Sequence, residues 1–299
     1  MNTNNYPLVS FITLNYNNTS VTADLLRSMR KLTYPNIEVI VVDNHSDIDP
    51  APELMAVYPD VKIIYNSKNL GFTGGNNAGI HSARGEYLFF INNDTEVNPN
   101  LVEPLLDVFE NYPDAGAVSP KIYYFFHPGI IQYAGYKKIN SFTGRTGAIG
   151  SKKVDNGQYD FIKPTYYAHG AAMMIPRKVM EQVGEWPDIY FIYYEELDLS
   201  LAIRRKGYKI YFQPRSILYH KESMTVGKSS PFKTYYMNRN RILFMRRNVS
   251  FFSLIFFYSY LLFFTIPKNS ATFILKKQRD HLLAFWKAII WHMRHPILD

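Results

Sequence analysis

Short apolar runs alternate with amphipathic stretches through the first third of the chain. Each run is rich in Val, Ile, Leu or Phe and ends in a polar cluster, which is typical of buried strands in a parallel sheet. The predicted strands are 8–14, 37–42, 61–65 and 86–91, and the predicted helices between them are 20–31, 52–58 and one that follows the turn-rich segment 69–75 and ends near 83. Strands that alternate with helices predict an α/β fold, with a mixed, mainly parallel sheet flanked by helices.

The pattern is less regular after position 98. A helix is predicted over 99–111, a strand over 168–175, a helix over 195–206 and a strand over 208–213. The stretch 121–165 is rich in Gly, Tyr and Lys and has no clear period. We interpret it as loops and short strands over the cleft.

The C-terminal region has a different composition. Residues 249–266 carry no charge, and the length of this segment is at the lower limit for a membrane-spanning helix. Residues 281–293 predict a second helix with one apolar face. A pair of helices lying in the membrane interface fits these lengths better than a span, and a helical layer packed on the domain is the alternative. We therefore predict a catalytic domain at 1–227 and a helical, membrane-associated region at 228–299.

Charge follows the same division. The chain has a net charge of +8. Residues 228–299 contain twelve Lys and Arg and two acids, whereas 1–227 contain 21 bases and 23 acids. A basic, apolar tail predicts an anionic membrane surface as partner and argues against nucleic acid. Cys is absent and residues 1–5 resemble no secretory signal, so we expect a peripheral protein at the cytoplasmic membrane face, of bacterial type.

Polar residues close the predicted strands. Thr13, Asn15 and Tyr16 end the first strand, Asp43 follows the second, and Asp94 follows the fourth. The carboxyl ends of parallel strands lie side by side, and ligands of open α/β sheets bind at that edge. We expect Thr13, Asn15, Tyr16 and Asp43 to hold a nucleobase and its ribose.

The glycine-rich segment matches neither G-x-G-x-x-G nor a P-loop. Asn69, Gly71, Gly74 and Asn76 nevertheless stand where a helix begins, and its N–H groups and amides are suited to an anion. A plain glycine-rich helix start is the other interpretation.

Two acidic features suggest chemistry. A divalent ion on a nucleotide diphosphate needs few protein ligands, and Asp94 and His220 are the candidates, although a single His is often structural. Glu195 and Glu196 follow an aromatic run and begin a helix. They are either an acidic first turn favoured by the helix dipole or a general base made stronger by desolvation.

Taken together, these motifs are similar to those of the family 2 glycosyltransferases, in the rhamnosyltransferase-like branch, over roughly residues 8–248. The motifs are Thr-Leu-Asn-Tyr-Asn (13–17), Val-Val-Asp-Asn-His-Ser (41–46), Asn-Leu-Gly-Phe-Thr-Gly-Gly-Asn-Asn-Ala-Gly (69–79), Asn-Asn-Asp-Thr (92–95) and Tyr-Tyr-Glu-Glu-Leu-Asp-Leu (193–199). The set is specific where single members are not.

The resemblance implies a glycosyltransferase A-type fold and an inverting single displacement on a nucleotide-diphosphate sugar. It implies that Asp43 binds the base or ribose, that Asn92-Asn93-Asp94 is the Asp-x-Asp motif, and that Asp94 and His220 lie at a Mg²⁺ or Mn²⁺ ion. It places the catalytic base at Glu196, with Glu195 as the neighbour able to share the task.

Arg239-Asn240 matches a basic pair of this branch, and we expect Arg239 or Arg241 to offset charge on the departing diphosphate. The chain departs from the family at Asn92, where the motif has Asp, and at Glu196, which is one methylene longer than the usual Asp. The Gln-x-x-Arg-Trp motif of processive enzymes is absent, so we expect transfer of a single sugar.

The expected donor is dTDP-rhamnose or a UDP-sugar, and the expected acceptor is a lipid-linked saccharide or a growing surface polysaccharide. Two other classes stay open. One is a nucleotidyltransferase acting on sugar phosphates, which shares a nucleotide-binding α/β sheet. The other is a non-catalytic sugar-nucleotide or glycan binder at the membrane.

Overall fold

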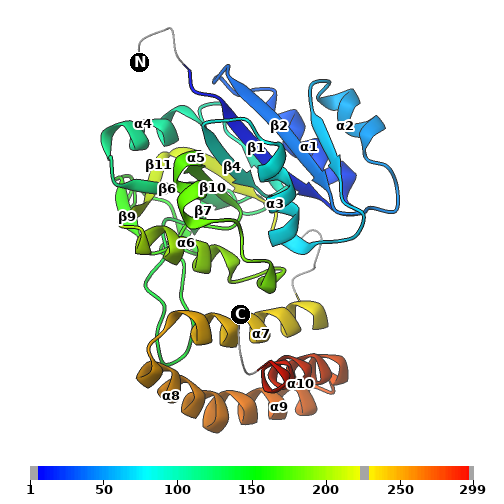
Figure 1. The fold of residues 1–299 in the computed structure, drawn as a ribbon, viewed down its shortest axis with the longest axis vertical. Coiled ribbons are helices and arrows are strands. Elements are labelled where there is room, and N and C mark those ends of the chain that lie inside the picture. Colours follow the sequence, from blue (N-terminus) through cyan, green and yellow to red (C-terminus); the bar gives the residue numbers. More distant parts are fainter. Residues whose placement is uncertain (1–5, 223–228, 296–299) are drawn as a thin grey trace. The chain divides into compact units, whose positions relative to one another are not determined.

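A computed structural model describes residues 6–222 and 229–295 of the chain (Figure 1). The predicted absence of a signal at residues 1–5, and the predicted domain boundary at 227 and 228, lie outside the described residues. The chain divides into two compact units. The first holds the described residues of 1–137, 148–191 and 195–225, and the second holds those of 138–147, 192–194 and 226–299.

The N-terminal part of the first unit follows the predicted alternation. Its strands pair in parallel in the order β3-β2-β1-β4. The elements are β1 (Val9–Asn15), α1 (Thr19–Met29), β2 (Ile37–Asp43), α2 (Ala51–Val57), β3 (Lys62–Tyr65), α3 (Gly71–Ser82) and β4 (Tyr87–Ile91). Every strand and helix predicted before residue 92 is present, with ends shifted by a few residues.

The sheet continues past β4 in the order β10-β6-β11-β5. β10 runs antiparallel to β4 and β6, whereas β11 runs parallel to β6. The elements are β5 (Thr95–Val97), α4 (Glu103–Asn111), β6 (Ala115–Tyr124), β7 (Ile130–Tyr133), β8 (Lys153–Val154), β9 (Lys163–Thr165), β10 (Ala172–Pro176), α5 (Arg177–Val183), η1 (Asp188–Tyr190), α6 (Glu195–Arg205) and β11 (Lys209–His220). The predicted α/β class, a mixed sheet flanked by helices, is confirmed.

Three local features differ from the predicted elements. β6 begins at Ala115, in a stretch where Gly116 and Pro120 interrupt the sequence pattern of a strand. β11 joins the predicted strand 208–213 to the apolar run before His220, because a bulge after Gln213 absorbs the interruption. α3 begins at Gly71, inside the predicted turn. Its first N–H groups have acceptors there, because Asn69 Oδ1 accepts from Gly71 and the Phe191 carbonyl accepts from the next two residues.

The core has two apolar layers, one on each face of the sheet. Successive residues of a strand point to opposite faces. Accordingly, Phe11 and Phe89 belong to one layer and Ile12 and Phe90 to the other, and all four are fully buried. The alternation orients β1 and β4 rigidly and fixes where their C-terminal ends lie.

The second unit is mainly helical. It contains α7 (Pro231–Asn248), α8 (Phe251–Tyr260), the π-helical segment η2 (Leu261–Thr265), α9 (Ile266–Leu275) and α10 (Arg279–Arg294). α10 packs against α7 and α9 and buries Ala284, Phe285 and Ala288. The second helix predicted in the C-terminal region, 281–293, is therefore present as α10.

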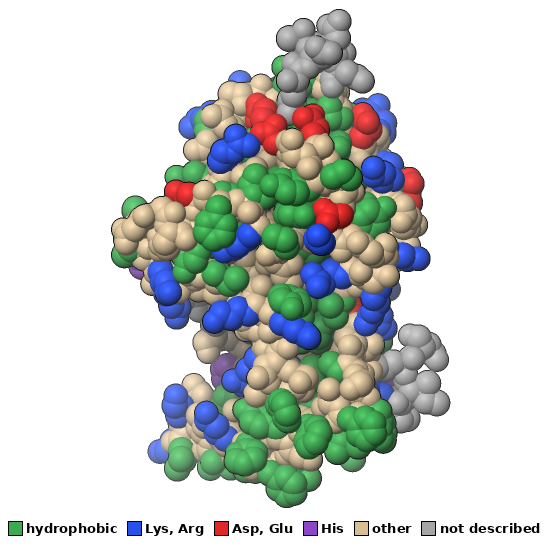
Figure 2. Space-filling model, turned by 90° about the vertical axis from the view of Figure 1, so that its left-hand side faces the viewer, with side chains coloured by type: hydrophobic (Ala, Val, Ile, Leu, Met, Phe, Trp, Pro, Cys, Tyr) green, Lys and Arg blue, Asp and Glu red, His purple; other side chains and the backbone are tan. Residues whose placement is uncertain are grey.

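The helices α8 and α9 are different in character. Together they form one helical stretch, Phe251–Leu275, that is long and apolar enough to cross a membrane, and only 17% of its apolar window is buried. Phe252 is 74% exposed and Leu275 is 83% exposed. Figure 2 shows exposed apolar side chains gathered on the second unit.

Candidate active site

Asn15 and Asp43 meet at the carboxyl ends of β1 and β2. They are partners in the parallel register of these strands. The Asn15 Nδ2 donates to Asp43 Oδ1 at 2.8 Å, and both side chains are buried. Ser46 donates to the same carboxylate through its N–H at 2.9 Å and its hydroxyl at 2.6 Å. The Asp43 carboxylate is therefore held in one orientation at the ligand-binding edge of the sheet.

A chain of hydrogen bonds continues from this carboxylate to the end of β4. Thr22 Oγ1 donates to Asn15 Oδ1 at 2.7 Å, and Asn93 Nδ2 donates to Thr22 Oγ1 at 2.9 Å. Asn92 is fixed through its N–H, which donates to Ala171 O at 3.0 Å. The structure thus joins the predicted nucleoside-binding residue to the Asn92-Asn93 segment.

Two further predicted residues lie at the end of β1. Thr13 is buried, and its hydroxyl finds no hydrogen-bond partner among the described residues. Tyr16 is 38% exposed. A buried hydroxyl without a partner is costly, so Thr13 has donor and acceptor capacity left for a ligand.

Asp94 and His220 form a buried pair. β5 and β11 pair antiparallel with Thr95 opposite His220, which brings the imidazole beside the carboxylate. His220 Nε2 lies 3.1 Å from Asp94 Oδ1, and His220 Nδ1 lies 2.8 Å from Gln132 Oε1. Gln132 Oε1 is an acceptor, so Nδ1 carries the proton. A second proton or a cation between Nε2 and the carboxylate oxygen would then join these two atoms.

This donor set fits a divalent ion. A carboxylate oxygen and an imidazole nitrogen converge, and the far imidazole nitrogen is oriented by an amide, as is common for metal-ligating His. No group of three or more His, Cys, Asp or Glu suited to a metal occurs within residues 6–222 and 229–295. Further ligands would therefore come from the substrate or water, as is usual for ions carried on diphosphates.

His169 and Tyr136 connect this pair to the acidic start of α6. The rings of His169 and His220 are 6.3 Å apart, and Tyr136 stacks on His169 at 5.7 Å. Burial, with the charge of His220, lowers the pKa of His169 to about 3. His169 is therefore a neutral acceptor, and its Nδ1 accepts from the Ala171 N–H at 3.0 Å.

Glu195 and Glu196 begin α6 and differ in exposure. Glu196 is half-buried. A Cβ built on Gly170 would lie 3.7 Å from its side chain, so Glu196 lies beside the backbone that follows His169. Burial and then the charge of Glu196 raise the pKa of Tyr136 well above its usual value. Tyr136 and His169 thus form the connection between Glu196 and His220.

Glu195 points into the protein. It is buried, and its Oε2 has no hydrogen-bond partner among the described residues. Burial, and then the negative charge of Glu196, raise the pKa of Glu195 well above the usual value. Burial beside a second carboxyl group therefore favours the protonated form of Glu195.

The predicted anion-binding residues of α3 are engaged within the fold. Asn69 Oδ1 accepts from the Gly71 N–H at 2.8 Å, and Asn76 Nδ2 donates to Phe72 O at 2.8 Å. Gly74 packs against Leu70 without room for a side chain. These contacts lie within α3 and the turn before it, and the binding of a donor by Asn69, Gly71, Gly74 and Asn76 stays a prediction.

The backbone before Glu195 is strained. Phe191, Tyr193 and Tyr194 have φ of 64°, 72° and 74°, in the left-handed region that non-glycine residues rarely adopt. Within the second unit, Asn240 Nδ2 donates to Ile192 O at 2.7 Å and to Tyr193 O at 2.9 Å. These bonds offset the strain in the segment that leads into the acidic pair.

Arg239 lies in the second unit and orients Asn240. Its Nε donates to Asn240 Oδ1 at 2.7 Å, and its guanidinium stacks 4.8 Å from the Tyr236 ring and 5.0 Å from the Trp291 ring. Arg239 is 7% exposed. Its predicted contact with the donor stays a prediction.

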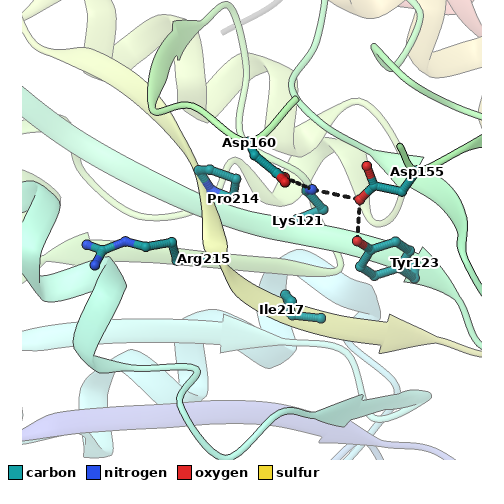
Figure 3. Close-up of a pocket in the computed structure, with 7 residues that line it drawn as sticks. All are labelled: Lys121, Tyr123, Asp155, Asp160, Pro214, Arg215 and Ile217. Carbon is teal, nitrogen blue, oxygen red and sulfur yellow. Dashed lines mark hydrogen bonds and ion pairs between the residues drawn. The ribbon is translucent and has the colours of Figure 1, made fainter. Parts of the chain in front are cut away.

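A separate cavity of ≈ 290 Å³ contains none of the predicted site residues (Figure 3). There the buried Lys121 Nζ forms ion pairs with Asp155, at 2.7 Å, and with Asp160. Tyr123 donates to the same Asp155 carboxylate. These bonds tie the chain around 155–160 to β6, as the dashed lines in Figure 3 show.

Sequence reasoning missed Gln132, Tyr136 and His169. The first two lie in the stretch that was interpreted as irregular, and nothing in their spacing marks them. His169 was assigned to a strand without a role. Only the pairing of β6, β7 and β11 brings these side chains beside His220.

With the fold and the site described, the family can be stated. Residues 10–184 match the family model "Glycosyl transferase family 2", which covers more than half of the chain. The chain therefore belongs to glycosyl transferase family 2.

Individual relatives show which named glycosyltransferases the chain is similar to. The chain is 27% identical over 215 residues, 69% of its length and 66% of the relative's, to the "Low-salt glycan biosynthesis hexosyltransferase Agl10" of Haloferax volcanii. It is 24% identical, over 67% of its length and 72% of the relative's, to the "N-acetylglucosaminyl-diphospho-decaprenol L-rhamnosyltransferase" of Mycobacterium tuberculosis. The aligned part thus spans about two thirds of these relatives.

The fold is also that of solved enzymes. The mannosyltransferase PcManGT of Pyrobaculum calidifontis, solved with GDP-Man and Mn²⁺, superposes with a TM-score of 0.59 at 15% identity, over 99% of this chain and 77% of that one. At that identity the likeness shows a shared fold. The predicted glycosyltransferase A-type fold is confirmed.

Proposed function

We propose that the chain transfers rhamnose or a hexose from a nucleotide-diphosphate sugar to a saccharide acceptor, with inversion at the anomeric carbon. The observation that carries this proposal is the connection of the Asp94–His220 pair to Glu196 through His169 and Tyr136. A charge-holding pair and a carboxylate base that are linked in this way suit the displacement of a diphosphate by a hydroxyl.

The donor nucleoside is assigned to the ends of β1 and β2. Asp43 would accept from a base N–H or a ribose hydroxyl, with Asn15 and Ser46 holding the carboxylate in place. Thr13 and Tyr16 would complete this subsite. dTDP-rhamnose and UDP-sugars are the proposed donors, supported by the rhamnosyltransferase and hexosyltransferase names of the relatives.

Asp94 and His220 would hold Mg²⁺ or Mn²⁺, with Asn92 and Asn93 beside them. When bound, such an ion neutralises charge on the donor diphosphate and on the departing nucleoside diphosphate. Gln132 keeps the His220 ring oriented and its Nε2 turned toward Asp94. Arg239 stays the proposed further cation on the donor side.

Glu196 is the proposed base. Its carboxylate accepts the proton of the acceptor hydroxyl as that oxygen attacks the anomeric carbon, and the bond from this carbon to the diphosphate oxygen breaks on the opposite face. The proton then passes to solvent. Glu195 is the neighbour of this base, and its burial favours the uncharged form of its carboxyl group. A second negative charge there would disfavour ionised Glu196.

The acceptor is proposed to be a saccharide on a lipid carrier or a growing surface polysaccharide, at the cytoplasmic face of the membrane. The exposed apolar side chains of α8 and α9 and the basic charge of 228–299 support this location. The mycobacterial relative's name denotes a diphospho-decaprenol acceptor. The proposed division of labour is catalysis in 1–227 and membrane association in 228–299.

Release of nucleoside diphosphate from a panel of nucleotide sugars, with Mg²⁺ or Mn²⁺, tests this function. We expect release with at least one donor, lost in Asp94→Ala and in Glu196→Gln. Pyrophosphate release from a nucleoside triphosphate and a sugar phosphate would instead identify a nucleotidyltransferase. Tight donor binding without any turnover would identify a non-catalytic binder.

A further inference from the structure

The second unit buries an arginine that has no anion. Arg241 is 3% exposed, and its Nε and Nη2 donate to no atom of the described residues. The groups whose charge acts on the pKa of Arg241 are Tyr194, Arg145 and Tyr260, and none of them is a carboxylate. Within the second unit the described residues contain thirteen Lys and Arg but a single acid, Asp280. Burying a cation without a partner is costly, so its retention points to an anionic ligand.

The surroundings of Arg241 come from three segments of the same unit. Its Cγ lies beside Gly144, where Met245 and Phe257 also make contact. Gly144 has a φ of 63°, and the Tyr194 hydroxyl donates to its carbonyl at 3.0 Å. A side chain at position 144 would be strained and crowded against Arg241. The chain is thus folded closely around the stem of the guanidinium.

A second cation lies nearby and is exposed. Arg145 follows Gly144 and is exposed to solvent, and its charge adds to burial in lowering the pKa of Arg241. Two like charges would repel one another unless an anion lies with them. One buried and one exposed arginine are suited to a phosphate, which accepts several N–H bonds at once.

The apolar surface beside this pair indicates which phosphate. Phe257 and Tyr260 of α8 lie on the Arg241 side, whereas Phe256, on the outer side, is 55% exposed. Phe142, which belongs to the same loop as Arg145, packs on Phe256 with ring centroids 5.5 Å apart. The site therefore joins buried positive charge to an exposed aromatic surface. A lipid phosphate is complementary to this site, because it joins a negatively charged headgroup to an apolar chain.

We propose that Arg241 and Arg145 bind the phosphate of a membrane lipid, with the lipid chain lying along α8 and Phe142. This inference rests on the proposed function in one respect, since it takes the chain to act at a membrane. It does not depend on any step of sugar transfer. The phosphate belongs either to the polyprenyl carrier of the acceptor or to an anionic phospholipid.

The test is vesicle binding of the full-length protein. The vesicles contain phosphatidylcholine alone, phosphatidylcholine with phosphatidylglycerol, or phosphatidylcholine with a polyprenyl monophosphate. We expect Arg241→Met to weaken binding to at least one of the two anionic preparations by about 10- to 100-fold. The preparation affected identifies the source of the phosphate.

Arg247→Met is the matched control, because it removes an exposed arginine of the same helix. A nonspecific surface charge is worth about 1 kcal/mol near an anionic membrane, so this change should cost only about fivefold. Equal losses in the two variants would overturn the site, because they would show general charge attraction.

Thermal unfolding separates ligand binding from a structural role. Because Arg241 is an uncompensated buried charge, Arg241→Met should raise the unfolding temperature in lipid-free buffer. The polyprenyl phosphate or phosphatidylglycerol should stabilise the unchanged protein but not this variant. A lower unfolding temperature together with unchanged vesicle binding would overturn the inference.

Two further results keep this inference distinct from the proposed function. If Arg241→Met abolishes binding of a soluble nucleoside diphosphate, the arginine belongs to the donor site and the lipid assignment is wrong. If the unchanged protein releases nucleoside diphosphate but binds all vesicles independently of Arg241, only the inference fails. Arg241-dependent vesicle binding without any turnover would leave the inference standing and remove the proposed function.

Discussion

The strand ends around Asp43 and the start of α6 use buried polar groups in opposite ways. The Asp43 carboxylate accepts from Asn15 and from Ser46, on regular strands that the sheet holds rigidly. Glu195 has an oxygen without a partner and follows three left-handed residues. The Asp43 carboxylate is satisfied before any ligand arrives, whereas the segment before Glu195 stores unfavourable energy beside the proposed base. The proposed donor-binding carboxylate thus lies on a relaxed part of the backbone, whereas the proposed base follows a strained one.

The largest expected effect concerns the relaxed region. Asp94→Asn should lower turnover about a thousandfold, because one ligand of the proposed ion loses its charge and metal stabilisation of a diphosphate is worth several kcal/mol. Donor turnover at increasing Mn²⁺ is the measurement. Glu96→Gln, which alters a half-buried acid of β5 paired with Lys221, is the control. Similar losses in both variants would remove the specific role of Asp94.

A smaller effect is expected when the support of His220 is removed. Gln132→Leu deletes the acceptor of the Nδ1 proton and should weaken Mn²⁺ binding about 10- to 100-fold. Thermal unfolding titrated with Mn²⁺ measures this without turnover. Gln132→Glu restores an acceptor and should recover most of the affinity. If Gln132→Leu binds Mn²⁺ normally, the orientation of His220 has another cause.

The strained region is tested through Asn240. Asn240→Ala removes two hydrogen bonds to the carbonyls of Ile192 and Tyr193 and should lower kcat about tenfold, while the donor KM stays unchanged. Asn238→Ala, which removes an amide bonded to Thr234 O on the same helix, should leave both constants unchanged. A rise in donor KM without a fall in kcat would assign Asn240 to donor binding instead.

The smallest effect is on stability against pH. His169 has a pKa of about 3 in the folded protein and of 6.5 in the unfolded chain, so the unfolded chain binds more protons between these values. Stability is therefore lost as the pH falls below 6.5, by about 1–2 kcal/mol at pH 5. His169→Asn keeps an acceptor for the Ala171 N–H and should flatten this loss. Denaturant unfolding at pH 8 and pH 5 decides the matter.

Sequence patterns were sufficient for the regular half of this fold. Apolar runs in β1, β2 and β4 predict both the strands and the shared edge where Asn15, Asp43 and Asp94 lie. The same patterns failed at β6, because Gly116 and Pro120 break the period while pairing on both sides restores the strand.

The candidate site was predictable only in part, for a related reason. Strand-end residues share an edge by topology alone, so Asp43 and Asp94 could be found. The partner of His220 could not, because Gln132 reaches it through the pairing of β7 with β6, across 88 positions of sequence. The difference between Glu195 and Glu196 depends on burial, and two adjacent glutamates carry no pattern that separates them.

The central claim is that Glu196 is the charged base and Glu195 its neutral neighbour. Turnover of Glu196→Gln and Glu195→Gln with the same donor and acceptor is the direct test. We expect Glu196→Gln to lose about 10²- to 10⁴-fold in kcat, the usual contribution of a general base. Glu195→Gln should keep nearly full activity, because an amide replaces a carboxyl group that is already uncharged. Full activity in Glu196→Gln with loss in Glu195→Gln would contradict the account.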